Sequence, residues 1–330
     1  VMELNFWTGT EFVGGEYNED KSCWTVDLKR SDGTLRKVRP SHLVMATSVS
    51  GIPNIPTIPT LEEFSGEIMH SSEFTSADSY KDRRVLVVGT GTSAHDIAQD
   101  LHSNGAKVCL LQRSPTSVVN VEPSAQLPYT LYDEGHSLDD TDLIAAATPL
   151  QALKSAHELI TKQSTHLDKD LLDGLTKVGF KIDREDRTGW QFKYMTRGGG
   201  YYFNVGCSDL IVNGEVGLIQ SDDIENFIAD GIKLKNGETQ TFDTIVLATG
   251  FKGMDAFVKQ RLGPEVAARV GPIWGFDETD QELRNMWVRT AQPGLWFIAG
   301  SFAQCRIYSK YLSLQVKACI EGLIPKNKHK

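Results

Sequence analysis

Arg84-Val85-Leu86-Val87-Val88-Gly89-Thr90-Gly91-Thr92-Ser93-Ala94 is an apolar strand pattern that runs straight into glycines and the start of a helical pattern. Glycines at such a junction permit a tight turn, and they let a pyrophosphate approach the N-terminal N–H groups of the helix. The strand Ala106–Leu111 follows and completes a βαβ unit. We predict a dinucleotide site, the alternative being a glycine-rich turn without a ligand. Its cofactor-binding residues are Gly89, Thr90, Gly91, Thr92, Ser93 and Ala94.

The end of the second strand indicates which nicotinamide cofactor is bound. An NAD enzyme usually carries Asp or Glu about 20 residues beyond the glycines, where it binds the ribose 2′-hydroxyl. Here the chain reads Gln112-Arg113-Ser114. A guanidinium beside a hydroxyl suits a 2′-phosphate, and no carboxylate in this run repels one. We predict NADPH with Arg113 and Ser114 on its phosphate; the alternative is an exposed arginine that ends a strand.

Composition limits the partners. The chain has 330 residues, 40% of them hydrophobic and 23% charged, which is typical of one large or two ordinary globular domains. The net charge of -9 disfavours nucleic acid. Five widely spaced cysteines favour a reducing compartment, hence a cytoplasmic protein, and no apolar run approaches the roughly 18 residues of a membrane span. Because the first residue is Val1, we expect further sequence upstream.

The rest of the chain predicts an α/β fold with two Rossmann-like domains. Residues 1–48 read as a β-meander, residues 51–59 as a proline-rich linker, residues 115–199 as a helical insertion with helices starting near Asp140 and Asp168, and residues 309–322 as a last helix. An internal repeat supports two similar domains, since a turn and an apolar strand precede both Ala46-Thr47-Ser48 and Ala248-Thr249-Gly250. A chance match of two hairpins is the alternative.

We place the domains at 1–75 (a partial FAD-binding domain with the linker), 76–250 (the NADPH-binding domain with its insertion) and 251–330 (the return to the FAD-binding domain). By itself, His70 between the domains would be read as a hinge residue.

Four motifs together resemble the class B flavoprotein monooxygenases, the family of the flavin-containing monooxygenases. Residues Phe64 to Phe74 resemble that family's F-x-G-x-x-x-H-x-x-x-aromatic fingerprint, and Gly89 to Asp96 its NADPH turn. Ala248 to Phe251 is similar to its A-T-G-[FY] element, and Gly294 to Gln315 to its last flavin-side strand and helix. The likeness extends over essentially the whole chain.

The resemblance implies that NADPH reduces FAD, that O2 forms a flavin C4a-hydroperoxide, and that one oxygen atom passes to a small organic substrate. It gives His70 a positioning role and implies that no protein nucleophile is needed. It places Ser93 and Asp96 beside NADPH and the start of the last helix, near Ser309, beside the flavin. The further cofactor-binding positions are Ala46, Thr47, Thr249, Gly250, Gly300 and Gln304.

Three departures from the family's pattern matter. No strand with its own G-x-G-x-x-G turn precedes the first meander, so we expect an FAD-binding half that is incomplete at its N-terminus and binds FAD poorly. Ser48 stands where the family has glycine, which predicts strain if the backbone has a positive φ. Phe74-Thr75 replaces the tryptophan of strict Baeyer-Villiger enzymes, which favours amine or sulfide oxygenation over ketones.

A non-catalytic NADP-binding protein without flavin stays open, whereas a disulfide reductase would need a redox-active cysteine pair that the sequence lacks. The histidines are too scattered to predict a metal site. Substrate identity and oligomeric state stay open.

Overall fold

The computed structural model describes residues 3–48 and 50–325 and divides the chain into two compact units. The first unit contains residues up to Ile52 and from Phe251 onward, and the second runs from Pro53 to Gly250. The predicted change of domain after residue 250 matches this division. The one predicted after residue 75 does not, because residues 67–70 form a strand of the second unit's sheet.

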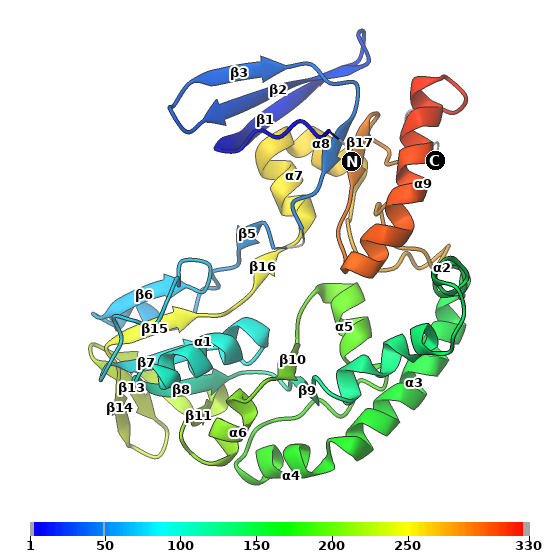
Figure 1. The fold of residues 1–330 in the computed structure, drawn as a ribbon. Helices are drawn as coiled ribbons and strands as arrows, with labels where there is room; N and C mark the ends of the chain where they lie inside the picture. The colour runs from blue at the N-terminus through cyan, green and yellow to red at the C-terminus, as the bar shows by residue number, and fades with distance from the viewer. Residues whose placement is uncertain (1–2, 49, 326–330) are drawn as a thin grey trace. The chain divides into compact units, whose positions relative to one another are not determined.

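The second unit is built on one parallel sheet of five strands (Figure 1). Their order is β11 (Gly217–Gln220), β8 (Lys107–Gln112), β7 (Arg84–Val88), β15 (Thr244–Leu247) and β6 (Glu67–His70). The central strands are continuously apolar because both faces of the sheet are covered. Val88 pairs with Leu111 and Leu247, so the turn after β7 and the ends of β8 and β15 meet at one edge.

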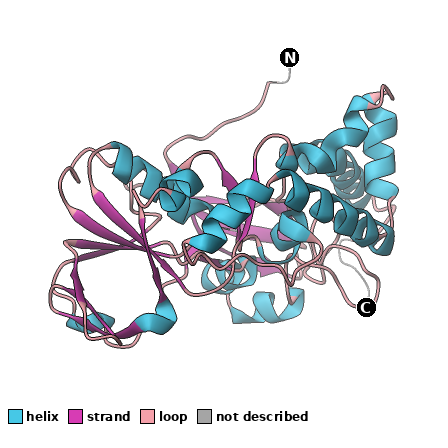
Figure 2. Ribbon diagram, turned by 90° about the horizontal axis from the view of Figure 1, so that it is seen from below, coloured by secondary structure: helices cyan, strands magenta, loops and turns pink. Residues whose placement is uncertain are grey.

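Each face of this sheet has its own core. Figure 2 distinguishes the helices from the strands by colour. One face packs against α1 (Thr92–Ser103), α4 (Lys169–Lys177) and α6 (Cys207–Val212). The other packs against a three-stranded antiparallel meander, β12 (Ile224–Ile228), β13 (Gly231–Leu234) and β14 (Thr239–Thr241), and against the neighbourhood of the 3₁₀ helix η1 (Leu61–Glu63). A second 3₁₀ helix, η3 (Ser221–Asp223), precedes the meander.

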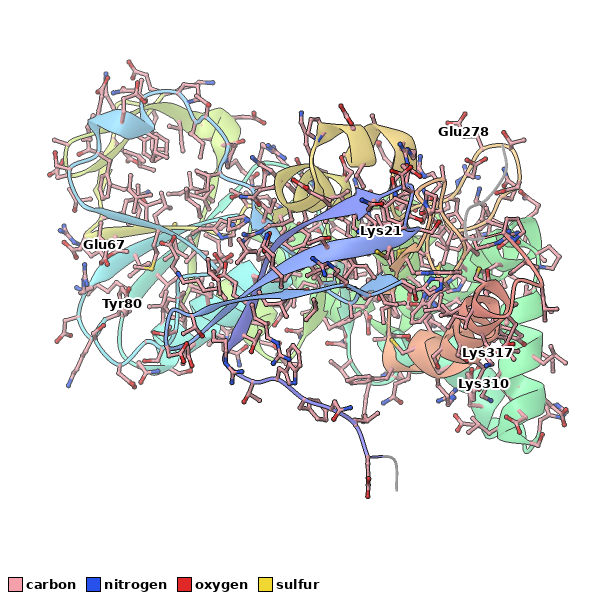
Figure 3. The ribbon with its side chains drawn as sticks, turned by 90° about the horizontal axis from the view of Figure 1, so that it is seen from above. Lys21, Glu67, Tyr80, Glu278, Lys310 and Lys317 are labelled. Carbon is pink, nitrogen blue, oxygen red and sulfur yellow. The ribbon has the colours of Figure 1, made fainter. Side chains whose placement is uncertain are left out.

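The edge strand β6 is anchored by charged side chains. Arg83 donates a hydrogen bond of 3.0 Å to the Glu67 carboxylate, and its guanidinium lies 5.0 Å from the centre of the Tyr80 ring. Glu67 and Tyr80 lie on the same side of the unit (Figure 3). This strand is therefore an integral part of the sheet.

The predicted helical insertion lies between two parallel strands, β9 (Ser117–Asn120) and β10 (Tyr201–Asn204). It contains η2 (Ser124–Asp133), α2 (Leu138–Ala147), α3 (Leu150–Leu167), α4 and α5 (Gly189–Arg197). A helix does start after Asp168, as predicted. A helix also starts near Asp140, as predicted: α2 begins at Leu138, and Ser137 caps it by accepting a hydrogen bond from the Asp140 N–H.

The first unit contains a second meander, β1 (Thr10–Asn18), β2 (Cys23–Arg30) and β3 (Leu35–Val38). It also has the parallel pair β4 (Leu43–Met45) and β17 (Leu295–Phe297), the pair β5 (Ile52–Pro53) and β16 (Phe251–Lys252), and the helices α7 (Met254–Leu262), α8 (Pro264–Val270) and α9 (Phe302–Ile320). The last helix therefore begins at Phe302, and the predicted start near Ser309 is wrong. Lys310 and Lys317 extend from it (Figure 3).

The internal repeat is present in the structure. Both meanders are antiparallel, and each has a register shift in its first strand pair, at Phe12/Gly14 and at Ile224/Asn226. The short strands β4 and β15 are each followed by Ala-Thr and then by a left-handed residue, Ser48 with φ 61° and Gly250 with φ 78°. The strain predicted for Ser48 is thus confirmed as a backbone conformation that costs a non-glycine residue about 1 kcal/mol.

Candidate functional site

The turn after β7 requires glycine first because of the neighbouring strand. Gly89 has φ 128°, and its N–H donates a 2.9 Å hydrogen bond to the Leu111 carbonyl. A Cβ added there would lie 2.5 Å from the Ala248 carbonyl oxygen. A side chain at position 89 would therefore push β7 and β15 apart.

Gly91 has a different reason to be glycine. It is the N-cap of α1 in an ordinary extended conformation, with φ -86°, and a Cβ there would meet nothing closer than the Tyr201 carbonyl at 3.9 Å. No side chain caps the helix, so the N–H groups of its first turn are left for a ligand. Open space in front of an uncapped helix N-terminus fits a pyrophosphate.

The other residues of the turn point in different directions. Thr90 is buried and shares a 2.7 Å hydrogen bond with the Thr116 hydroxyl, so only its backbone faces the turn. The Thr92 hydroxyl donates to the Tyr201 carbonyl at 3.2 Å. Ser93 and Asp96 are exposed, and desolvation raises the pKa of the Asp96 carboxyl. Ala94 is fully buried, as close packing of the helix on the sheet requires.

His95 supports the turn from below, and the sequence analysis missed it. Its Nδ1–H donates to the Gly91 carbonyl at 3.1 Å, and its ring stacks on Tyr202 with centroids 3.9 Å apart. Burial lowers the pKa of His95 to about 4, which keeps the imidazole neutral. A histidine four residues after the capping glycine was the available signal.

The end of β8 presents the two residues predicted for the 2′-phosphate. Gln112 is fully buried, and its side chain accepts a 2.7 Å hydrogen bond from the Lys181 N–H and donates one of 3.0 Å to the Lys181 carbonyl. This pairing fixes the end of the strand. Arg113 and Ser114 follow it exposed and side by side, with Arg113 Nε 3.4 Å from Ser114 Oγ.

His70 lies at the end of β6 and is only 2% exposed. The Ser72 N–H donates to its Nδ1 at 3.1 Å, so the proton resides on Nε2, which donates to the Gly250 carbonyl at 3.0 Å. The same carbonyl accepts from the Asn54 N–H at 2.9 Å, and the Thr249 hydroxyl donates to the Asn54 carbonyl at 2.6 Å. His70 therefore ties the end of β15 to the segment that enters the unit.

The remaining predicted residues lie in the first unit. Ala46 and Thr47 follow β4 and are exposed. Gly300 has φ 123° and precedes α9. Gln304 completes a capping box, since its Oε1 accepts from the Ser301 N–H at 3.0 Å while Ser301 Oγ accepts from the Gln304 N–H at 3.3 Å. One acceptor of Gln304 is thus used by its own helix.

Two classes of feature are missing from residues 3–48 and 50–325. No group of three or more His, Cys, Asp or Glu side chains in these ranges could hold a metal ion. Within the same ranges, none of the helices combines the length and apolar character needed to cross a membrane.

Known proteins resemble the chain in both sequence and fold. Residues 20–134 match the family described as flavin-binding monooxygenase-like. Probable indole-3-pyruvate monooxygenase YUCCA10 of Arabidopsis thaliana is 32% identical over 238 residues, which are 72% of this chain and 55% of that protein. FAD-containing monooxygenase EthA of Mycolicibacterium smegmatis (strain ATCC 700084 / mc(2)155) is 26% identical over 263 residues, 74% of this chain and 50% of that protein. The chain spans about half the length of these curated relatives.

Solved structures share the fold at low sequence identity. Cyclohexanone monooxygenase from Rhodococcus sp. Phi1 bound to NADP+ matches with a TM-score of 0.55 at 16% identity, over 95% of this chain and 65% of that one. OTEMO in complex with FAD and NADP matches with a TM-score of 0.60 at 15% identity, over 95% and 67%. The motifs, the fold and these relatives agree, and the chain belongs to the flavin-containing monooxygenase family.

Proposed function

We propose that this protein is part of an NADPH- and FAD-dependent monooxygenase that inserts one oxygen atom of O2 into a small organic substrate. The observation that carries the proposal is the uncapped N-terminus of α1 behind Gly91, with Arg113 exposed at the end of the next strand. Family membership supports the flavin chemistry. All five cysteines are free, which favours a reducing compartment such as the cytoplasm.

In this proposal the second unit holds NADPH. The first-turn N–H groups of α1 bind its pyrophosphate, Arg113 and Ser114 bind its 2′-phosphate, and Ser93 and Asp96 line its path. Bound NADPH supplies a hydride, and bound FAD supplies the activation of O2. His70 holds the Gly250 carbonyl and so positions the A-T-G segment without touching the reacting atoms. The residues that would border the cofactors elsewhere are Ala46, Thr47, Thr249, Gly250, Gly300 and Gln304.

For the substrate we favour an amine or a sulfide. Phe74 stands where strict Baeyer-Villiger enzymes carry tryptophan, and its ring packs 5.8 Å from that of Tyr80. Two alternatives have their own support. The fold likeness to cyclohexanone monooxygenase favours a ketone as substrate. The curated relative YUCCA10 is named for indole-3-pyruvate, which favours a 2-oxo acid.

The NADPH assignment is tested by replacing Arg113 with alanine. Loss of a charge-assisted contact to the 2′-phosphate weakens NADPH binding about 10- to 100-fold and leaves NADH binding unchanged. Calorimetric titration of both nucleotides measures the ratio. Lys107→Ala at the opposite end of β8 is the matched control and keeps the wild-type preference. Equal losses for both nucleotides would contradict the assignment.

The oxygenase assignment is tested on the flavin-loaded full-length protein. NADPH-dependent O2 consumption with an amine, a sulfide and a ketone, combined with detection of the oxygenated product, identifies the substrate class. Tight NADPH binding without any flavin reduction would instead favour a non-catalytic NADP-binding protein.

A further inference from the structure

A cavity lies within the insertion. It is partly open, its volume is about 620 Å³, and it is lined by β9, α3, Leu172 of α4, the segment 182–188 and the start of α5. All of its lining residues belong to the second unit, and none of them is a residue expected to bind NADPH. The volume is within the range of sites for small organic ligands.

The buried part of the lining is neutral. Val118, Leu172 and His157 are 3%, 5% and 4% exposed. Among the charged lining residues, Lys162, Arg184 and Arg187 are exposed, whereas Glu158 is half-buried. A charge carried to the buried part would lose its hydration without gaining a partner there, so the lining favours an uncharged ligand.

One wall is held in place by a buried ion-pair network. Lys193 on α5 is 1% exposed and pairs with Asp183 and with Asp186, the latter at 3.2 Å. Asp186 also accepts from the Thr188 N–H at 3.0 Å. Lys193 compensates one of the two negative charges, and these bonds fix the segment 182–188 before any ligand arrives.

Two polar groups in the lining have no hydrogen-bond partner among the residues that the structure describes. The His157 ring makes only an edge contact with Phe192, at 5.3 Å between centroids, and Gln191 Oε1 is buried and unpaired. Burial lowers the pKa of His157 to about 4, so its neutral ring has one N–H donor and one nitrogen acceptor. The buried and unpaired Gln191 Oε1 is costly, so a ligand that donates a hydrogen bond to it gains affinity.

We propose that this cavity is a binding site for an uncharged ring compound that carries a hydroxyl group. The ring packs against the apolar lining of Val118 and Leu172. The hydroxyl both donates and accepts, so it can pair with the His157 ring and with Gln191 Oε1. None of the lining residues is one that we expect to bind NADPH or FAD.

The test uses 2-naphthol and its methyl ether, 2-methoxynaphthalene, as probes in calorimetric titrations of the whole chain. We expect 2-naphthol to bind and the ether, which cannot donate, to bind about tenfold more weakly. His157→Phe keeps the aromatic contact but removes both nitrogens, and it weakens 2-naphthol about tenfold. His166→Phe, on the exposed side of the same helix, is the matched control and keeps wild-type affinity.

A second variant guards against a folding defect. Thr165→Trp places a large ring at the exposed rim of the cavity and abolishes 2-naphthol binding. Both lining variants keep wild-type NADP+ affinity, which shows that the second unit is folded. Wild-type protein that does not bind 2-naphthol, equal affinity for the two probes, or unchanged binding in both variants would overturn the proposal.

Discussion

Gly89 and Gly91 stand two positions apart and owe their identity to different neighbours. At Gly89 the protein itself excludes a side chain, because φ is 128° and the Ala248 carbonyl lies in the way. At Gly91 the space is open, and only an incoming ligand would need it. One glycine serves the fold and the other serves binding.

The two alanine variants separate these roles. Gly89→Ala lowers the free energy of unfolding by about 2–4 kcal/mol, since it combines backbone strain with a backbone clash. Gly91→Ala lowers it by less than about 1 kcal/mol but weakens NADPH at least about tenfold, because the methyl group occupies the pyrophosphate's approach. Urea unfolding and nucleotide titration measure the two effects. Wild-type NADPH affinity in Gly91→Ala would show that the turn holds no pyrophosphate.

Single residues also show which features of the structure can be predicted from the sequence. The G-x-G-x-x-A spacing sufficed to predict the turn, because this pattern between an apolar strand and a helix is typical of a pyrophosphate-binding turn. Gln112 was read only as part of a run, yet it is buried and bonded to Lys181, 69 positions along the chain. A contact between residues so far apart cannot be predicted from the residues near Gln112.

Among the elements, α5 illustrates how a buried charge organises a segment. Lys193 extends from this helix into the interior and holds Asp183 and Asp186 of the preceding segment. Lys169 makes an ion pair of the same chemical type with Asp173 on α4, but both of those side chains are more than half exposed. The two lysines therefore differ in burial and in their number of acidic partners, and both differences make Lys193 the more important for stability.

Methionine substitutions measure that difference. Lys193→Met leaves two acids without their buried partner and lowers the free energy of unfolding by about 3–5 kcal/mol. Lys169→Met changes it by less than about 0.5 kcal/mol. Urea unfolding followed by circular dichroism compares them. If both variants changed the free energy of unfolding by similarly small amounts, water would be compensating the charges of Asp183 and Asp186.

Element boundaries were predicted less well than element types. The start of α9 was placed seven residues late, although Ser301 and Gln304 have the S-x-x-Q spacing of a capping box. The exposed Phe302 obscured the helical pattern there. Strand β6 was assigned to a linker because it has only four residues and its partner is distant in sequence.

For the molecule as a whole, two units built on the same plan account for the repeat seen in the sequence. Each has a meander followed by a parallel strand with an Ala-Thr ending. Two imidazoles, His95 and His157, are buried in the second unit and stay neutral in the folded state. Stability must therefore depend on pH.

The direction of this pH dependence follows from the number of protons that the folded and unfolded chains bind. The pKa of each ring falls from 6.5 to about 4 on folding, so between these values the unfolded chain binds more protons than the folded one. Above pH 6.5 the two neutral rings do not lower the free energy of unfolding. As the pH drops to 4, the free energy of unfolding falls by up to about 3 kcal/mol per histidine. Urea midpoints at pH 7.5, 6 and 5 measure it. His157→Phe flattens the dependence, and an unchanged slope would refute the assignment.

The pairing of β6 with β15 has a consequence for the order of events on the ribosome. Glu67 and Thr244, which are paired across these strands, stand 177 positions apart. At typical elongation rates β6 emerges roughly 10–35 s before its partner strand is made. During that interval its backbone N–H and C=O groups and those of the waiting edge of β7 have no strand between them to bind, so the nascent chain passes through a state open to chaperones and to mispairing.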